Sequence, residues 1–231
     1  MKTIGIIGGM GPLAAADLFK KIIFKTDAKT DQDHIRILID NNTNIPDRTA
    51  CIKGMGPSPV DELIKSAKLL ENAGADFIIV SCNTAHYFMP EVTPHIGIPF
   101  MSMIDETAKA CKRMGTDCVG LLASEGTSAS GIYCDALAHQ YIDMVEPEPD
   151  DLHVVHEIIY DGIKAGNTSF DTTEFRRVLK NMQERGAKQF ILGCTELPIA
   201  VEMFGIEGNF IDPTEILAIK AIEFAGAKVI G

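Results

Sequence analysis

Residues 58–82 read SPVDELIKSAKLLENAGADFIIVSC and combine a helix, a helix end and a buried strand. Ser58 and Pro59 are typical of a helix start, and the apolar residues that follow recur on one helical face. Gly74 favours the left-handed conformation that ends a helix. The run Phe77-Ile78-Ile79-Val80 then predicts a strand, and this strand ends at Cys82.

A second stretch repeats this order about 112 residues later. Asp171-Thr172-Thr173-Glu174 predicts a helix start and Gly186 a helix end. The run Phe190-Ile191-Leu192 predicts a strand that ends at Cys194, and the glycine and the cysteine are eight residues apart in both copies. Because the features recur in the same order, we predict an internal duplication.

Both halves open with an apolar run that ends in small residues, at 4–12 and at 119–127. Each run predicts a buried strand and a tight turn. Strands that alternate with helices predict parallel sheets with right-handed crossovers, so the fold class is α/β with two small domains. Ligands of such sheets bind beyond the carboxyl ends of the strands, where Cys82 and Cys194 lie.

The composition indicates a soluble globular protein. Of the 231 residues, 46% are apolar and 23% charged, and the formal net charge is -11. This charge argues against a nucleic-acid or anionic-membrane partner, but one or two placed cations could still hold an anionic small molecule. No apolar run approaches the ~20 residues of a membrane helix. Residues 1–5 lead directly into strand-like sequence without a signal-peptide pattern, so we expect a cytoplasmic protein.

The six cysteines include no CxxC pair, and free thiols are the default in a cytosolic chain. Four of them read as small hydrophobic residues, namely Cys51, Cys111, Cys118 and Cys134. Cys82 and Cys194 differ because both have small polar neighbours and both precede a predicted helix start, where thiolates are favoured. We expect their surroundings to activate them.

Two thiols on opposite sides of one cleft would suit proton removal from one face of a carbon and delivery to the other face. This arrangement requires the two domains to face each other. A disulfide or redox pair is the competing interpretation, and it is disfavoured because strand ends across a ligand cleft are too far apart to bond.

Five motifs together resemble the aspartate/glutamate racemase family, and within it the cofactor-independent aspartate racemases. The motifs are Gly8-Gly9-Met10-Gly11-Pro12, Asn44-Ile45-Pro46-Asp47-Arg48-Thr49, Ser81-Cys82-Asn83-Thr84-Ala85-His86, Gly126-Thr127 and Gly193-Cys194-Thr195-Glu196. The resemblance runs from residue 1 to about 225.

The resemblance implies two pseudo-symmetric α/β domains, an active site in the cleft between them, no pyridoxal phosphate and usually a homodimer. It also implies that the last strand and helix return to the first domain. We also expect no other cofactor and no metal. The expected domains are 1–103 with 210–231 on the Cys82 side, and 104–209 on the Cys194 side.

The resemblance also assigns roles. Cys82 and Cys194 would be the acid/base pair. The substrate's α-carboxylate and amino group would be held by Asn83, Thr84, Thr127 and Thr195, and Met10 would lie in the substrate-binding opening loop. Arg48 and Lys164 would bind the distal carboxylate of an acidic amino acid. Capping, turn or solvated surface roles are the alternatives for the polar residues.

Two departures from the glutamate racemases point to the aspartate branch. Those enzymes carry His where this chain has Glu196, and Asp in the place that Met10 takes. Glu196 is therefore a candidate for supporting the thiols. His86 follows the first cysteine motif and is a second candidate, which either points into the cleft or caps a turn. The sequence leaves open which groups support each thiol. The predicted reaction is interconversion of L- and D-aspartate, with glutamate second.

Other functions compete with this prediction. A broad-specificity racemase, or a related cysteine-dependent decarboxylase or isomerase, uses the same kind of site. Gly9-Met10-Gly11-Pro12-Leu13-Ala14 matches a dinucleotide fingerprint, but Glu125 in the duplicated loop would repel a pyrophosphate. A binding module without chemistry is a further alternative. A metal site at His153 and His156 is another, but this stretch of sequence reads better as a solvated helix start.

Overall fold

The computed structural model describes residues 1–230, and these form two compact units. The first unit comprises Met1–Glu106 and the C-terminal segment from Thr214, and the second comprises Thr107–Pro213. Each unit is built on one parallel sheet. The predicted α/β fold with two parallel-sheet domains is confirmed.

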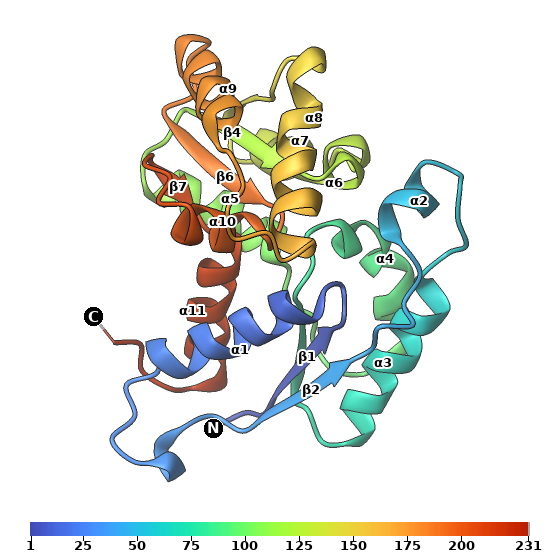
Figure 1. Cartoon of the computed structure of the whole chain (residues 1–231). Coiled ribbons are helices and arrows are strands. Elements are labelled where there is room, and N and C mark those ends of the chain that lie inside the picture. The colour runs from blue at the N-terminus through green and yellow to red at the C-terminus, as the bar shows by residue number, and fades with distance from the viewer. Residues whose placement is uncertain (231) are drawn as a thin grey trace. The chain divides into compact units, whose positions relative to one another are not determined.

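The sheet of the first unit has the strand order β2-β1-β3. Its elements are β1 (Ile4–Gly8), α1 (Pro12–Lys25), β2 (Ile37–Asn41), α2 (Arg48–Ile52), α3 (Val60–Asn72), β3 (Phe77–Val80), α4 (Met89–Val92) and α11 (Pro213–Ala225). Figure 1 shows α1 in blue and α3 in teal beside the strands β1 and β2.

Successive residues of the fully buried β1 face different cores. Ile4 and Ile6 pack in a cluster with Leu18 of α1, whereas Ile7 packs in a cluster with Leu63 of α3. This alternation is the period-two pattern of a strand covered on both faces.

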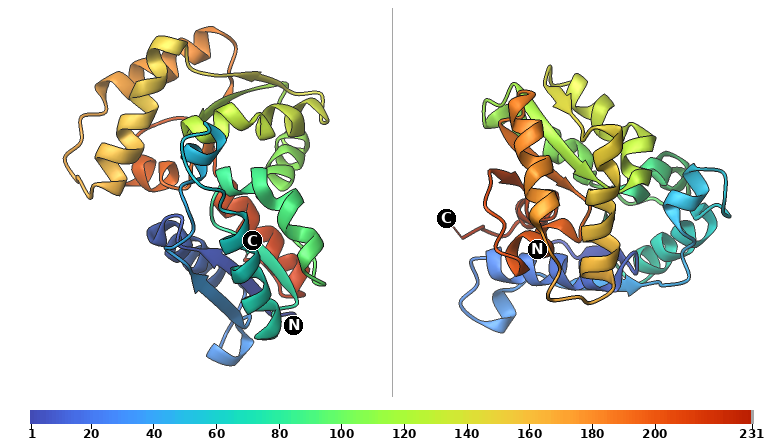
Figure 2. Two further views of the ribbon diagram at one scale, coloured as in Figure 1. Left: turned by 90° about the vertical axis from the view of Figure 1, so that its right-hand side faces the viewer. Right: turned by 45° about the horizontal axis from the view of Figure 1, so that its top comes forward.

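The sheet of the second unit has the strand order β5-β4-β6-β7. Its elements are β4 (Cys118–Ala123), α6 (Glu125–Ser130), α7 (Ile132–Ala138), β5 (Asp143–Val145), α8 (Leu152–Glu157), a π-helical segment (Ile158–Lys164), α9 (Thr173–Glu184), β6 (Gln189–Gly193), α10 (Leu197–Met203) and β7 (Phe210–Ile211). Figure 2 shows α8 in gold and α9 in orange lying side by side. Helix α5 (Met103–Arg113) contains the division between the two units.

The helix ends predicted from glycine are confirmed. Gly74 has φ +93° and Gly186 has φ +106°, both in the left-handed region that glycine adopts at low cost. The strands predicted to follow them are β3 and β6.

One predicted connection is wrong. The strand near residue 210 was expected to return to the first domain with the last helix, but β7 pairs with β6 in the second sheet, through Phe190↔Phe210 and Ile191↔Ile211. The chain leaves the second unit only after Pro213, at the start of α11. None of the helices between residues 1 and 230 combines the length and apolar character needed to span a membrane.

Candidate active site

The turn after β3 carries Cys82 and is tied to the neighbouring strand. Ser81 is fully buried, and both its N–H and its hydroxyl donate to the Ile7 carbonyl oxygen, at 3.1 and 3.3 Å. Cys82 follows directly and is 6% exposed. The thiol therefore lies at the carboxyl end of a buried parallel strand, as predicted.

His86 links this turn to the start of α5. Its Nδ1 donates to the Cys82 carbonyl oxygen at 2.8 Å, and its Nε2 accepts from the Met103 N–H at 3.0 Å. Burial lowers the pKa of His86 to about 4, so the ring is neutral at pH 7. Because both ring nitrogens are engaged by backbone groups, His86 supports the backbone of the cysteine turn.

Arg48 is the first residue of α2, whose start is capped by Asp47 through a 2.6 Å bond from the Ala50 N–H. The guanidinium donates to the carbonyl oxygens of Pro46 at 2.9 Å, Ile45 at 3.3 Å and Met10 at 3.5 Å. Within the described chain no carboxylate pairs with it, and its buried Nε has no hydrogen-bond partner there. The geometry leaves a half-buried positive charge available to an anion.

Met10 belongs to the same hydrophobic cluster as Cys82, Ile45 and Ala85. The opening loop, the segment that precedes Arg48 and the cysteine turn therefore meet at one edge of the first sheet. Asn83 and Thr84 are also buried, directly after Cys82.

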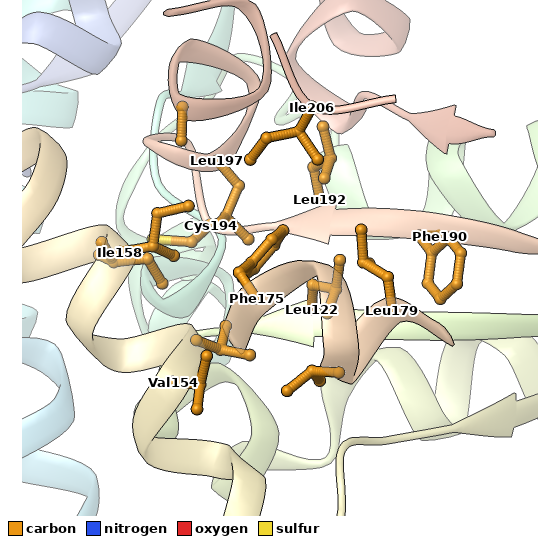
Figure 3. Close-up of a cluster of buried hydrophobic side chains, with 14 of the residues drawn as sticks. Leu122, Val154, Ile158, Phe175, Leu179, Phe190, Leu192, Cys194, Leu197 and Ile206 are labelled. Atoms are coloured by element: carbon orange, nitrogen blue, oxygen red, sulfur yellow. The ribbon is translucent and has the colours of Figure 1, made fainter. Parts of the chain in front are cut away.

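Cys194 directly follows β6 and is 8% exposed. Figure 3 shows it beside Ile158 and Leu197 in a cluster of buried apolar side chains. Its thiol Sγ donates to Oε2 of Glu196 at 3.0 Å, and the Thr195 hydroxyl donates to the same oxygen at 3.3 Å. Glu196 is 4% exposed, so this contact is shielded from water.

Lys164 completes this group. Its Nζ lies 3.8 Å from Oε1 of Glu196 and 4.4 Å from the centroid of the Tyr160 ring. Lys164 is the last residue of the π-helical segment, and such wide turns redirect side chains at functional sites. The structure thus brings Cys194, Glu196 and Lys164 together in the second unit.

The environment of Cys194 favours the thiol. Burial and the neighbouring Glu196 carboxylate raise its pKa well above the ordinary value, and Lys164 opposes this only in part. These surroundings raise the pKa of Cys194, which is opposite to the activation expected from the sequence. Glu196 is placed to accept its proton.

Thr127 lies in α6, just beyond β4, and is buried with its hydroxyl 3.2 Å from that of Ser124. Because β4 and β6 are neighbouring parallel strands, Thr127 and Cys194 follow the same edge of the second sheet. Within residues 1–230, no group of three or more His, Cys, Asp or Glu side chains is arranged to hold a metal ion.

Sequence reasoning missed Tyr133, which is fully buried on α7. Burial raises the pKa of its phenol, which hydrogen-bonds to the side chain of Thr107. A tyrosine on the buried face of a helix carries no signal that separates it from other core aromatic residues.

Each of the two sheets ends at a buried cysteine beside polar and charged groups. Together with the relatives of the chain, this pattern defines a racemase, which is a class of isomerase. The family model described as Asp/Glu/Hydantoin racemase matches residues 7–221. The chain belongs to this family.

Three relatives place the chain more closely. RacX of Bacillus subtilis, a broad specificity amino-acid racemase, is 26% identical over 221 residues, which cover 93% of this chain and 94% of the relative. The aspartate racemase structure from Picrophilus torridus matches with a TM-score of 0.84 and 33% identity, covering 100% of this chain and 96% of that one. A glutamate racemase from Francisella tularensis, at 20% identity and TM-score 0.71, covers 96% and 80% of the two chains and shows the shared fold alone.

Proposed function

We propose that this chain is a cofactor-independent racemase that interconverts L- and D-aspartate, with Cys82 and Cys194 as opposed acid and base. The observation that carries the proposal is the duplication of the thiol. Each parallel sheet of a racemase-family chain ends at a buried cysteine in a polar turn. A reversible reaction with two mirror-related substrates needs such matched groups.

In the proposed reaction, one cysteine acts as a thiolate and takes the proton from the α-carbon. The C–H bond breaks, an S–H bond forms, and the electron pair moves into the α-carboxyl group, where hydrogen-bond donors stabilise the charge. The other cysteine, as a thiol, donates its proton to the opposite face of the carbon. By the family resemblance, Cys194 serves L-aspartate and Cys82 serves D-aspartate.

Glu196 has a defined part in this scheme. Before Cys194 can act as a base, its thiol proton must leave, and Oε2 of Glu196 at 3.0 Å is the acceptor that we assign. A substrate carboxylate that approaches Lys164 would compete for the ammonium with Glu196. Substrate binding and proton transfer at Cys194 are thus connected through one carboxylate.

The test of the two-base reaction is serine substitution at each cysteine. Cys82→Ser and Cys194→Ser should each abolish racemisation, because a hydroxyl is too weak an acid to form the base at neutral pH. Chiral chromatography measures the racemisation of each enantiomer, and α-proton exchange in deuterated water detects a surviving half-reaction.

Cys134→Ser is the matched control, since Cys134 is an exposed cysteine of the second unit. It should retain the wild-type rate. Racemisation at near wild-type rates by both Cys82→Ser and Cys194→Ser would rule out the two-base reaction.

Arg48 supports an acidic substrate. Backbone carbonyl groups hold its guanidinium without neutralising it. A second carboxylate on the substrate is the natural partner of such a charge, and Arg binds carboxylates bidentately. Aspartate satisfies this requirement, with glutamate second.

Arg48→Leu should lower kcat/KM for aspartate by roughly two orders of magnitude or more, on the order of 3 kcal/mol for a lost charged partner. It should leave kcat/KM for alanine nearly unchanged. Arg113→Leu, at an exposed position of α5, is the control for loss of an arginine. Unchanged aspartate kinetics in Arg48→Leu would overturn the assignment of this residue.

A broad-specificity racemase is the second candidate, and two observations favour it. The RacX relative covers nearly the whole chain. Lys164 is already paired with Glu196, which reduces the positive charge available to a distal carboxylate. Steady-state rates on a panel of single-enantiomer amino acids distinguish the candidates, and faster racemisation of alanine than of aspartate would favour broad specificity.

A further inference from the structure

The segment that ends at Lys164 carries two aromatic side chains at helical spacing. His156, Tyr160 and Lys164 follow one another at intervals of four residues through α8 and the π-helical segment, so they lie along one face. The rings of His156 and Tyr160 lie 4.2 Å apart between centroids, at an interplanar angle of 51°. The Lys164 Nζ lies over the Tyr160 ring, 4.4 Å from its centroid. Tyr160 therefore connects the other two side chains.

The ammonium of Lys164 contacts the Tyr160 ring and the carboxylate of Glu196. Its distance of 3.8 Å to Oε1 of Glu196 is longer than a hydrogen bond. The Lys164 side chain is 33% exposed, and the side chain of Glu196 is 5% exposed. Because lysine has a flexible four-carbon stem, a long and partly exposed ion pair restrains it only weakly. The contact with Glu196 alone therefore does not fix the position of the ammonium.

An aromatic ring can hold an ammonium without neutralising it. The face of a tyrosine ring attracts a cation within about 6 Å of its centroid, and the attraction grows where water is partly excluded. Tyr160 is half-buried, and the π-helical segment that carries it packs against α10, which begins directly after Glu196. Figure 3 shows Ile158 of the same segment beside Cys194. The ring therefore belongs to a packed segment next to the thiol.

We propose that Tyr160 is a positioning residue for Lys164. Its ring keeps the ammonium beside Glu196, where the positive charge partly offsets the carboxylate that contacts Cys194. The ring also leaves the ammonium available to the distal carboxylate of an acidic substrate. This second effect rests on the function proposed above, whereas the first effect does not.

The alkylation rate of Cys194 tests the position of the ammonium without requiring racemase activity. In Tyr160→Leu the ammonium should spend less time beside Glu196, so the thiol should hold its proton more tightly and react roughly threefold more slowly with iodoacetamide at pH 8. Tyr160→Phe keeps the ring and should react at the wild-type rate. Tyr141→Leu is the matched control and should also react at that rate, because Tyr141 is 89% exposed and its ring lies 5.9 Å from the Lys112 Nζ.

A double-variant cycle separates positioning from a purely structural role. If Tyr160 acts through Lys164, its ring has no effect on the thiol once the ammonium is gone. Tyr160→Leu combined with Lys164→Met should therefore react no more slowly than Lys164→Met alone. A loosened core would instead expose Cys194 and speed alkylation, and urea unfolding measures any loss of stability separately. Additive slowing in the double variant, a wild-type rate in Tyr160→Leu, or equal slowing in Tyr160→Phe would each overturn the proposal.

Steady-state kinetics test the effect on the substrate. Tyr160→Leu should raise KM for aspartate roughly three- to tenfold and leave KM for alanine nearly unchanged, because alanine has no distal carboxylate. Tyr160→Phe should keep the wild-type KM for both amino acids. Equal increases of KM for aspartate and alanine in Tyr160→Leu would overturn the role toward the substrate. A chain that does not racemise aspartate would contradict the proposed function alone, since the alkylation cycle needs no turnover.

Discussion

Glu196 and Lys164 act on the Cys194 thiol in opposite directions. The carboxylate raises the pKa of Cys194, and the ammonium lowers it. Burial adds to the effect of the carboxylate, so the free chain holds a protonated Cys194. This thiol is the acid form that the proposed conversion of D- to L-aspartate requires.

Removing either partner should change the reactivity of Cys194 in a defined direction. Glu196→Gln removes the negative charge, lowers the pKa and should speed alkylation by iodoacetamide at pH 8, because only the thiolate reacts. Lys164→Met should raise the pKa and slow alkylation. Mass spectrometry measures modification of Cys194 relative to the exposed Cys134.

Racemase activity separates proton transfer from thiol reactivity in these variants. Glu196→Gln should react faster with iodoacetamide yet racemise more slowly, because the acceptor of the thiol proton is lost. Equal alkylation rates in both variants would show that Glu196 and Lys164 do not control Cys194.

At the scale of the elements, the loop after β1 positions Met10, whose carbonyl oxygen accepts from Arg48. Gly9 turns this loop with φ +89°, and a Cβ atom there would lie 2.3 Å from the Asn42 carbonyl oxygen. Gly74 has a similar φ of +93° but open space around its Cβ position. The two glycines therefore share a conformation and differ in their neighbours.

Gly9→Ala should destabilise the protein by about 2–4 kcal/mol, which combines about 1 kcal/mol for the left-handed backbone with a backbone clash. Gly74→Ala should cost only the first of these contributions. Urea unfolding measures both, and kcat/KM for aspartate should fall in Gly9→Ala alone. Equal losses of stability would mean that the loop after β1 adjusts freely.

Local signals predicted most of these elements. Glycine at the helix ends and continuous apolar runs identified α3, β3, α9 and β6, because conformation there follows from short-range chemistry. The two-residue strand β7 could not be assigned from such signals, since its pairing with β6 depends on contacts between distant segments.

The sequence predicted part of the candidate site. The thiols could be found because each ends a strand in a duplicated pattern. The ion pair of Lys164 with Glu196, which itself contacts Cys194, could not be predicted. The π-helical segment determines where Lys164 lies, and a regular helical period does not predict that position. The sequence also could not predict the backbone groups that hydrogen-bond to His86, because one of them, the Met103 N–H, is 17 residues away.

At the scale of the whole molecule, two effects of pH on stability oppose each other. The net charge of -11 at pH 7 approaches zero near the pI of 5.0, so self-repulsion decreases as the pH falls. His86 acts in the other direction. Its folded-state pKa is about 4 against an ordinary value of 6.5, so between these values the unfolded chain binds a proton that the folded chain does not.

The contribution of His86 is therefore present above pH 6.5 and is lost as the pH falls toward 4, by up to about 3 kcal/mol. His86→Gln loses the ring's hydrogen bonds to the backbone, so it should be less stable than wild type at pH 7. Because glutamine does not titrate, this difference in stability should shrink as the pH falls toward 4. Urea unfolding of both proteins across this range cancels the effect of net charge, which they share. A difference that stays constant with pH would contradict a buried neutral His86. Proton NMR of the His86 ring across the same pH range tests its protonation directly.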